Sequence, residues 1–214
     1  MLTWAAAWRG EKHIKDGDLL RDGKRAMLKR LHDLFNEADA VVTWNGDDFD
    51  LKILNKEWML LRLPPPRPYK SLDLIRTSRG KFRFTSNKLD FVAAQIKTHR
   101  KQKNRGHELW LDCMARKRKA FAEMRRYNRG DIRPLINIYE RFRPWMTTHP
   151  NVNMYHGGYD RPKCTYCGHA HVLVVKARRT QQGTKRQWQC QSAKCGGYFT
   201  VAPKPPKPPA KVSA

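Results

Sequence analysis

Four cysteines in the C-terminal quarter of the chain are spaced as metal ligands. They form two pairs, Cys164-x2-Cys167 and Cys190-x4-Cys195. Thiolates at these spacings bind zinc in zinc ribbons, where a β-hairpin joins two metal-binding knuckles. The 22 residues between the pairs fit such a hairpin, because they contain a β-prone run at 171–176 and a Gln-Gln-Gly turn at 181–183. We expect one closed, structural zinc site without a catalytic role.

Other residues near these pairs leave alternatives open. His169 and His171 could ligate the metal, although Cys195 already supplies a fourth ligand. The basic residues of the hairpin, interleaved with aromatic ones, indicate a nucleic-acid contact. They are Arg178, Arg179, Lys185 and Arg186, with Trp188 and Tyr198. The alternative is a small folded module whose aromatic residues only cover the metal. The fifth cysteine, Cys113, has no neighbouring base and is expected to be a buried apolar residue.

A second group of chemically active residues follows a short apolar run. Residues 40–43 predict a buried strand, and Asn45-Gly46-Asp47-Asp48 ends it before a helix at 48–61. Ligands bind at the carboxyl ends of strands in open α/β sheets. Asp47 and Asp48 suit the helix N-cap and first turn, whereas Asp50 is a candidate for chemistry. The alternative is that all three acids only start the helix.

A third group pairs a phenol with a carboxylate. Tyr127 precedes Asp131 by four residues, and we expect helices at 107–127 and 131–143 with Gly130 between them. Pro134 fits only the first turn of the second helix. Asp131 at a helix start and Tyr127 could then face one cleft, although this spacing also occurs by chance in many helices.

The remaining pattern predicts an α/β domain that positions these groups. Strands are expected at 2–8 and 12–15, and helices at 22–38 and 87–96, the latter with Ser86 as N-cap. Four prolines between 64 and 68 make a rigid loop, and 71–75 begins another apolar stretch.

The charge of the chain favours a polyanionic partner. Lys and Arg number 44 against 19 acids, a formal charge of +25, and nucleic acid is the expected partner. Residues 97–143 hold fifteen basic residues against five acids, which indicates a phosphate-facing surface, although solvated helix faces could explain part of it. No apolar run has the length of a membrane span, and the N-terminus lacks the apolar core of a signal peptide, so a soluble, cytoplasmic protein is expected.

These segments together resemble the DEDD 3′-5′ exonucleases of ribonuclease H-like fold, over about residues 2–200. The tyrosine-bearing subgroup of bacteriophage genomes, with a C-terminal zinc ribbon, is the most similar. The second family motif matches Trp44-Asn45-Gly46 with Phe49-Asp50, and the third matches Tyr127 with Asp131. Between these two motifs, residues 86–90 and 106–110 resemble segments that the family has in the same order. The fold class implied is a mixed sheet flanked by helices, plus the ribbon.

The resemblance also implies roles. Asp50 and Asp131 would ligate Mg²⁺ or Mn²⁺, Tyr127 would orient the attacking water, and the reaction would be two-metal hydrolysis of terminal phosphodiesters. Substrate contacts would come from Asn45, Phe49, Lys88 and His107. DNA is expected as the substrate more than RNA, in the host cytoplasm if a phage encodes the chain.

One departure from the family puts activity in doubt. The family's first motif, an Asp-x-Glu pair on the central first strand, is absent ahead of Leu2. Two of four metal-binding carboxylates are then lacking, and the predicted hairpin and strand 40–43 would each have an open edge. Either the sequence begins at an internal methionine of a longer protein, which we favour, or the fold is repaired from elsewhere.

The expected organisation is therefore a nuclease domain at 1–147, a linker at 148–160, a zinc ribbon at 161–200 and a disordered Pro/Lys-rich tail at 201–214. The expected function is a 3′-5′ exonuclease. The alternative is a catalytically impaired nucleic-acid-binding protein that retains the fold.

Overall fold

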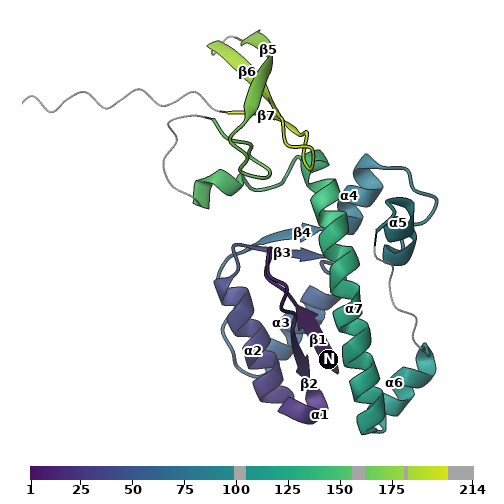
Figure 1. Ribbon diagram of the computed structural model, residues 1–214. Coiled ribbons are helices and arrows are strands. Elements are labelled where there is room, and N and C mark those ends of the chain that lie inside the picture. Colours follow the sequence, from purple (N-terminus) through teal and green to yellow (C-terminus); the bar gives the residue numbers. More distant parts are fainter. Residues whose placement is uncertain (99–104, 156–161, 181–182, 202–214) are drawn as a thin grey trace, which may run out of the picture. The chain divides into compact units, whose positions relative to one another are not determined.

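The computed structural model describes residues 1–98, 105–155, 162–180 and 183–201, and these belong to two compact units (Figure 1). The first unit is Met1–Met146 and the second begins at Thr147. Four predicted segments lie wholly or partly outside the described residues: the tail from 202 on, residues 156–160 of the linker, most of the basic loop after Lys97, and residues 161, 181 and 182 of the ribbon.

The first unit is of the predicted α/β class and contains two small sheets. Strands β1 (Thr3–Ala6) and β2 (Lys15–Asp18) are antiparallel, and β3 (Ala40–Thr43) and β4 (Lys70–Asp73) are parallel. Within the described residues the two pairs do not join into one sheet. The second strand was predicted three residues too early, because the loop after β1 is longer than the Arg9-Gly10-Glu11 turn suggested.

Helices connect and cover these strands. They are α1 (Leu19–Asp22), α2 (Lys24–Glu37), α3 (Asp50–Leu60), α4 (Leu74–Lys81), α5 (Leu89–Gln95), α6 (His107–Met114) and α7 (Arg118–Phe142), with a 3-10 turn, η1, at Arg143–Trp145. Helix α4 was not predicted, and α5 starts after Lys88 without a side-chain cap, so Ser86 as its N-cap was wrong.

Buried residues from β1, α2 and α3 form one apolar cluster of the unit. Its members are Trp4, Met27, Leu28, Leu31, Phe35, Leu51, Leu54 and Trp58. Both indole N–H groups are satisfied inside it, because Trp4 donates to the Met27 carbonyl (3.0 Å) and Trp58 donates to the Leu28 carbonyl (3.1 Å). A buried indole needs such a partner, so these bonds fix α2 against both β1 and α3.

Helix α7 contributes to two further clusters. Its N-terminal half packs Phe121 and Met124 against Leu109 and Cys113 of α6, and Cys113 is buried as predicted. Its C-terminal half packs Ile138, Tyr139 and Phe142 against Leu72 of β4 and against α5. One helix therefore supports both small sheets along its length (Figure 1).

The predicted helix boundary at Gly130 is wrong, because α7 runs through both Gly130 and Pro134. A proline ring inside a helix clashes with the carbonyl group four residues earlier. Here that residue is Gly130, whose backbone is the least restricted of any and can adjust to the ring. The break lies instead between α6 and α7, where Arg116 adopts a left-handed backbone (φ 58°).

The second unit is built on a three-stranded antiparallel sheet in the order β5 (Val172–Thr180), β6 (Gly183–Cys190), β7 (Tyr198–Thr200). A 3-10 turn, η2, at Val152–Tyr155 precedes it. The buried Asn153 side chain donates to the carbonyls of Lys163 (3.0 Å) and Cys164 (2.9 Å). Part of the segment predicted as a linker is therefore bound to the first knuckle.

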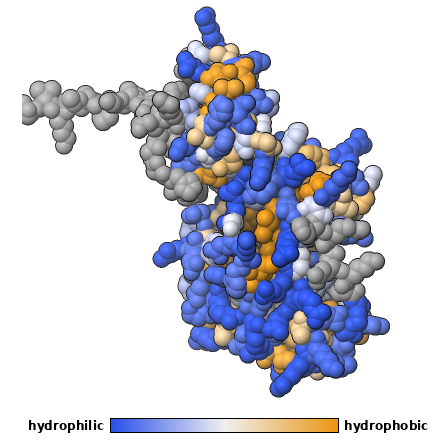
Figure 2. Space-filling view, in the orientation of Figure 1, coloured by the Kyte–Doolittle hydropathy of each residue, from blue (hydrophilic) through white to orange (hydrophobic). Residues whose placement is uncertain are grey.

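The first unit has no membrane-spanning helix among its described helices, and its strand β3 is partly exposed. Among the described helices, none combines the length and apolarity that crossing a bilayer requires. All four residues of β3 remain half-buried, and an apolar strip is open to view in this part of the first unit, beside α7 (Figure 2).

The contact between β2 and Trp4 gives a stability prediction. A Cβ at Gly17 would overlap the buried Trp4 indole and approach Met27 Cγ to 2.8 Å. We expect Gly17→Ala to lower the free energy of unfolding by about 1–3 kcal/mol, the usual cost of overpacking. Gly80→Ala is the matched control, because nothing lies within 4 Å of a Cβ there. In helix α4 it should be neutral or stabilising by up to about 1 kcal/mol. Urea unfolding measures both, and equal stability of the two variants would contradict the described packing.

Candidate functional site

The carboxyl ends of β3 and β4 are held together by a buried carboxylate, Asp73. Its Oδ1 accepts the N–H of Asn45 (2.7 Å) and its Oδ2 accepts that of Asp47 (3.2 Å). Asn45 has a left-handed backbone (φ 63°), which turns the chain sharply after β3. Asp73 therefore fixes the loop that leads to Asp50.

Asp73 also starts the next helix. It is the N-cap of α4 and accepts the N–H of Ile75, while only 5% of its surface is exposed. The sequence reasoning missed this residue. A detectable pattern was present, since Asp73 directly precedes Leu74 and Ile75, and an Asp immediately before a helical segment commonly caps it.

Asp47 and Asp48 do not cap α3, contrary to the prediction. Asp47 accepts the Ser71 hydroxyl and pairs with Arg76 (3.2 Å), so it ties the loop to β4 and α4. Asp48 pairs with Lys52 (3.6 Å) at the surface. Helix α3 begins at Asp50, after Phe49, which makes no side-chain cap.

Asp50 is exposed at the surface, yet its environment disfavours the charged form. Surrounding protein atoms remove part of its hydration, and the Asp73 carboxylate repels it, so the pKa of Asp50 lies above its ordinary value. A cation bound at Asp50 would relieve that repulsion. Phe49 beside it is 62% exposed, so its ring is accessible.

Tyr127 and Asp131 lie one turn apart in the middle of α7, not at a helix start. Spacing of four residues puts both on one face of the helix. Tyr127 packs against the cluster that α6 and α7 share, and both residues are half-buried. One further turn along, Leu135 packs in the cluster that contains Trp44 of the β3 loop. Asp131 thus lies between two packed ends of α7.

The remaining predicted substrate residues lie on different elements. The Trp44 indole donates to the Asn87 carbonyl (3.2 Å), which brings the segment of Lys88 next to the β3 loop. Lys88 is exposed just before α5, and His107 is the exposed first residue of α6. His107 therefore belongs with the α6–α7 end of the unit.

The two predicted metal sites differ in whether their ligands lie close together. Among the described residues, the four cysteines are the one group of three or more His, Cys, Asp or Glu side chains close enough to share an ion. Asp50, Asp73 and Asp131 do not form such a group. The described carboxylates are therefore not assembled into a complete two-metal site.

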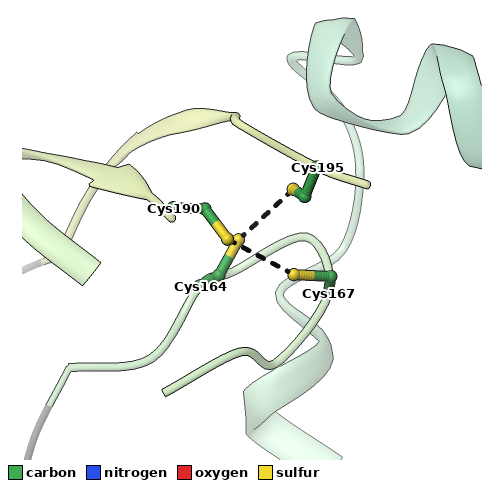
Figure 3. Close-up of side chains that lie close together, drawn as sticks. All are labelled: Cys164, Cys167, Cys190 and Cys195. Atoms are coloured by element: carbon green, nitrogen blue, oxygen red, sulfur yellow. Dashed lines mark hydrogen bonds between the residues drawn. The ribbon is translucent and has the colours of Figure 1, made fainter. Parts of the chain in front are cut away.

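The four thiol groups converge on one point (Figure 3). Their sulfur atoms all lie within 4.8 Å of one another, with Cys164 Sγ 3.7 Å from Cys195 Sγ and Cys167 Sγ 3.6 Å from Cys190 Sγ. Four sulfurs around zinc at about 2.3 Å are about 3.8 Å apart along each edge of the tetrahedron. The arrangement fits a closed four-thiolate zinc site, and His169 and His171 are not part of it.

Without a cation, Cys164 and Cys190 favour the neutral thiol form. Hydrogen bonding to Cys195 raises the pKa of Cys164, and burial raises the pKa of Cys190 to about 11. A divalent ion supplies the charge that deprotonates such ligands. Trp188 and Phe199 pack around the cysteines, so this side of the sheet shields the site.

The comparison with protein families decides the class of the first unit. A family model described as RNase H superfamily matches residues 16–143. The chain belongs to the ribonuclease H superfamily. The match extends from β2 to the end of α7 and includes Asp50, Tyr127 and Asp131. No match to a curated protein was found.

Membership of the ribonuclease H superfamily indicates, in general terms, that the first unit takes part in nucleic-acid processing. The match leaves the zinc-binding unit outside its limits. The family match therefore assigns the first unit, and the cysteine geometry assigns the metal site of the second.

Removal of one thiolate tests the zinc site. Wild-type protein purified under reducing conditions should contain about one zinc per chain, and Cys190→Ser should lose it and unfold the second unit. Cys113→Ser is the control, because Cys113 is buried in the first unit and should leave the zinc content unchanged. Elemental analysis that found no zinc in the wild type, or full zinc in Cys190→Ser, would contradict the assignment.

Proposed function

We propose that the ribonuclease H-like unit is a metal-dependent 3′-5′ exonuclease that acts on nucleic acid, with DNA as its expected substrate. The observation that carries the proposal is the position of Asp50 at the carboxyl end of β3, within the family match that also contains Asp131. Ligand sites of open α/β sheets lie at this end of the strands.

The proposed roles follow from the chemistry of each group. Asp50 and Asp131 would hold Mg²⁺ or Mn²⁺, since hard carboxylate oxygens fit these ions. Such ions activate water and stabilise the leaving oxygen of a phosphodiester. The Tyr127 hydroxyl would orient the water, and the exposed Phe49 ring and Lys88 would contact the terminal nucleotides. Asn45, whose backbone conformation is fixed by Asp73, would hold the substrate end.

The proposed exonuclease site uses four carboxylates, and Asp50 and Asp131 supply two of them. No Asp-x-Glu tripeptide occurs in the 214 residues. We propose that a strand bearing this pair joins the sheet layer at the free edge of β3. The half-buried state of all four β3 residues supports this, because strands of a covered parallel sheet are normally buried on both faces.

A second candidate function is nucleic-acid binding without hydrolysis. The specific observation in its favour is that the described acids form no group able to share an ion. Binding requires only the cationic surface, and α7 exposes Arg126, Arg133 and Arg141 along its length. Several other basic residues, one just before α6 and two in α7, are already engaged in ion pairs. Arg105 pairs with Asp112 and Glu123, Arg125 with Asp18, and Arg129 with Asp16.

The decisive variant carries an added N-terminal strand with Asp-x-Glu. This extended protein should shorten 5′-labelled DNA stepwise from the 3′ end with Mg²⁺ or Mn²⁺, while the 214-residue chain should be at most weakly active. Asp131→Asn and Asp50→Asn should each lower the rate by about 100-fold or more, since each removes a metal ligand. Tyr127→Phe should lower it less. Gel analysis of the products, with parallel DNA and RNA substrates, gives both rate and polarity.

Asp48→Asn is the matched control. Asp48 lies two residues from Asp50 but pairs with Lys52 at the surface, so its loss should leave the rate unchanged. Strong digestion by the unextended chain that Asp131→Asn does not reduce would refute the assigned site. An inactive extended protein that still binds DNA would establish the second candidate function.

A further inference from the structure

The sheet of the second unit has two faces of different composition, and its register assigns each residue to one of them. Trp188 pairs with Val174 on β5 and with Phe199 on β7, and Trp188 and Phe199 pack against the cysteines. Side chains alternate between the faces of a strand. The next row, made of Leu173, Gln189 and Tyr198, therefore lies on the opposite face.

A β-bulge brings a lysine onto this opposite face. Val174 pairs with Trp188, but Lys176 pairs with Gln187, so β5 has one extra residue at Val175. Without that residue, alternation would put Lys176 on the cysteine side together with Val174. We call the resulting surface the outer face. Its residues are Leu173, Lys176, Lys185, Gln187, Gln189 and Tyr198.

Tyr198 is the accessible aromatic residue of this face. It is 52% exposed, whereas the neighbouring Phe199 is 6% exposed and covers the cysteines. The Tyr198 carbonyl accepts the hydroxyl of Tyr166 (3.2 Å), which anchors its backbone to the first knuckle. The ring is therefore presented on a fixed strand and is not needed to shield the metal site. The predicted contact residue Trp188 lies on the other face.

Residues 162–201, which include the sheet, carry charge of one sign only. Residues 162–201 contain seven Lys and Arg and no Asp or Glu. Lys176 and Lys185 are exposed, while Gln187 and Gln189 are half-buried between them and Tyr198. Hydrophilic side chains also surround the apolar patch on the hairpin (Figure 2). A polyanion fits such a surface, because residues 162–201 contribute no acidic side chain that would repel it.

We propose that the outer face of this sheet is a binding platform for single-stranded nucleic acid. Tyr198 stacks on an unpaired base, Lys176 and Lys185 neutralise phosphates, and the Gln187 and Gln189 amides hydrogen-bond to base edges. Stacking on an exposed ring requires a base face that a duplex does not offer, so single strands are preferred. An acidic protein would use the lysines but would gain little from the ring and the amides.

The platform goes beyond the exonuclease proposal and is tested independently of it. Zinc-loaded full-length protein is titrated, without magnesium, into fluorescently labelled single-stranded oligothymidine and oligouridine, and anisotropy is measured. Tyr198→Ala should weaken binding to one or both by about 5-fold or more, the usual effect of losing one stacked base. Tyr198→Phe should retain nearly wild-type affinity. Heparin, a polyanion without bases, should bind wild type and Tyr198→Ala equally.

A neighbouring pair of basic residues supplies a test that does not depend on the tyrosine. Lys185 belongs to the outer face, whereas Arg186 lies on the opposite one, and both are exposed. Lys185→Gln should weaken binding of single strands more than Arg186→Gln. Zinc content and circular dichroism of each variant report on folding.

The proposal is overturned if Tyr198→Ala keeps wild-type affinity for both oligonucleotides. It is also overturned if the affinity of Tyr198→Ala for heparin falls as much as its affinity for the oligonucleotides. Equal losses in Lys185→Gln and Arg186→Gln would also overturn it, because the charge would then act without regard to the face. If Tyr198→Ala loses its zinc, Tyr198→Phe and the Lys185 and Arg186 pair decide the question. None of these results bears on the nuclease rate of the first unit.

Discussion

The burial of one face of α7 is the constraint on which the first unit depends. This helix packs Phe121 and Met124 at one end and Ile138 and Phe142 at the other, so it reaches both small sheets. A helix of this length gains its stability from such tertiary packing more than from its own sequence. Asp131 lies between the two packed regions, and its position is therefore set by residues on either side of it.

The same packing explains why an interior proline is tolerated. Pro134 is itself buried, and the residue that its ring would meet is Gly130. A local reading of the sequence takes these two residues as a helix boundary, because each alone ends helices. Tertiary burial of the whole apolar face outweighs both, and this could not be known from the local pattern.

Features that depend on short stretches of sequence could be predicted, and those that depend on distant partners could not. The bounds of β3 and the cysteine cluster follow from residues close together in sequence, and both were correctly predicted. The predicted burial of β3 was wrong, because its four residues are only half-buried among the described residues. The role of Asp73 required knowledge that β4 lies parallel to β3. The separation of Trp188 from Tyr198 required the register of β6 and β7, and the face of Lys176 required the bulge at Val175; composition reveals neither.

The proposed exonuclease site requires that Asp50 and Asp131 serve the same metal site once a strand with Asp-x-Glu is added. The most direct measurement is a Mn²⁺ titration of the extended protein followed by amide NMR. Paramagnetic broadening should reach residues 45–50 and 127–131 at the same Mn²⁺ concentration, and Asp131→Asn should reduce it in both segments. Broadening confined to one segment, or unchanged by Asp131→Asn, would contradict the claim.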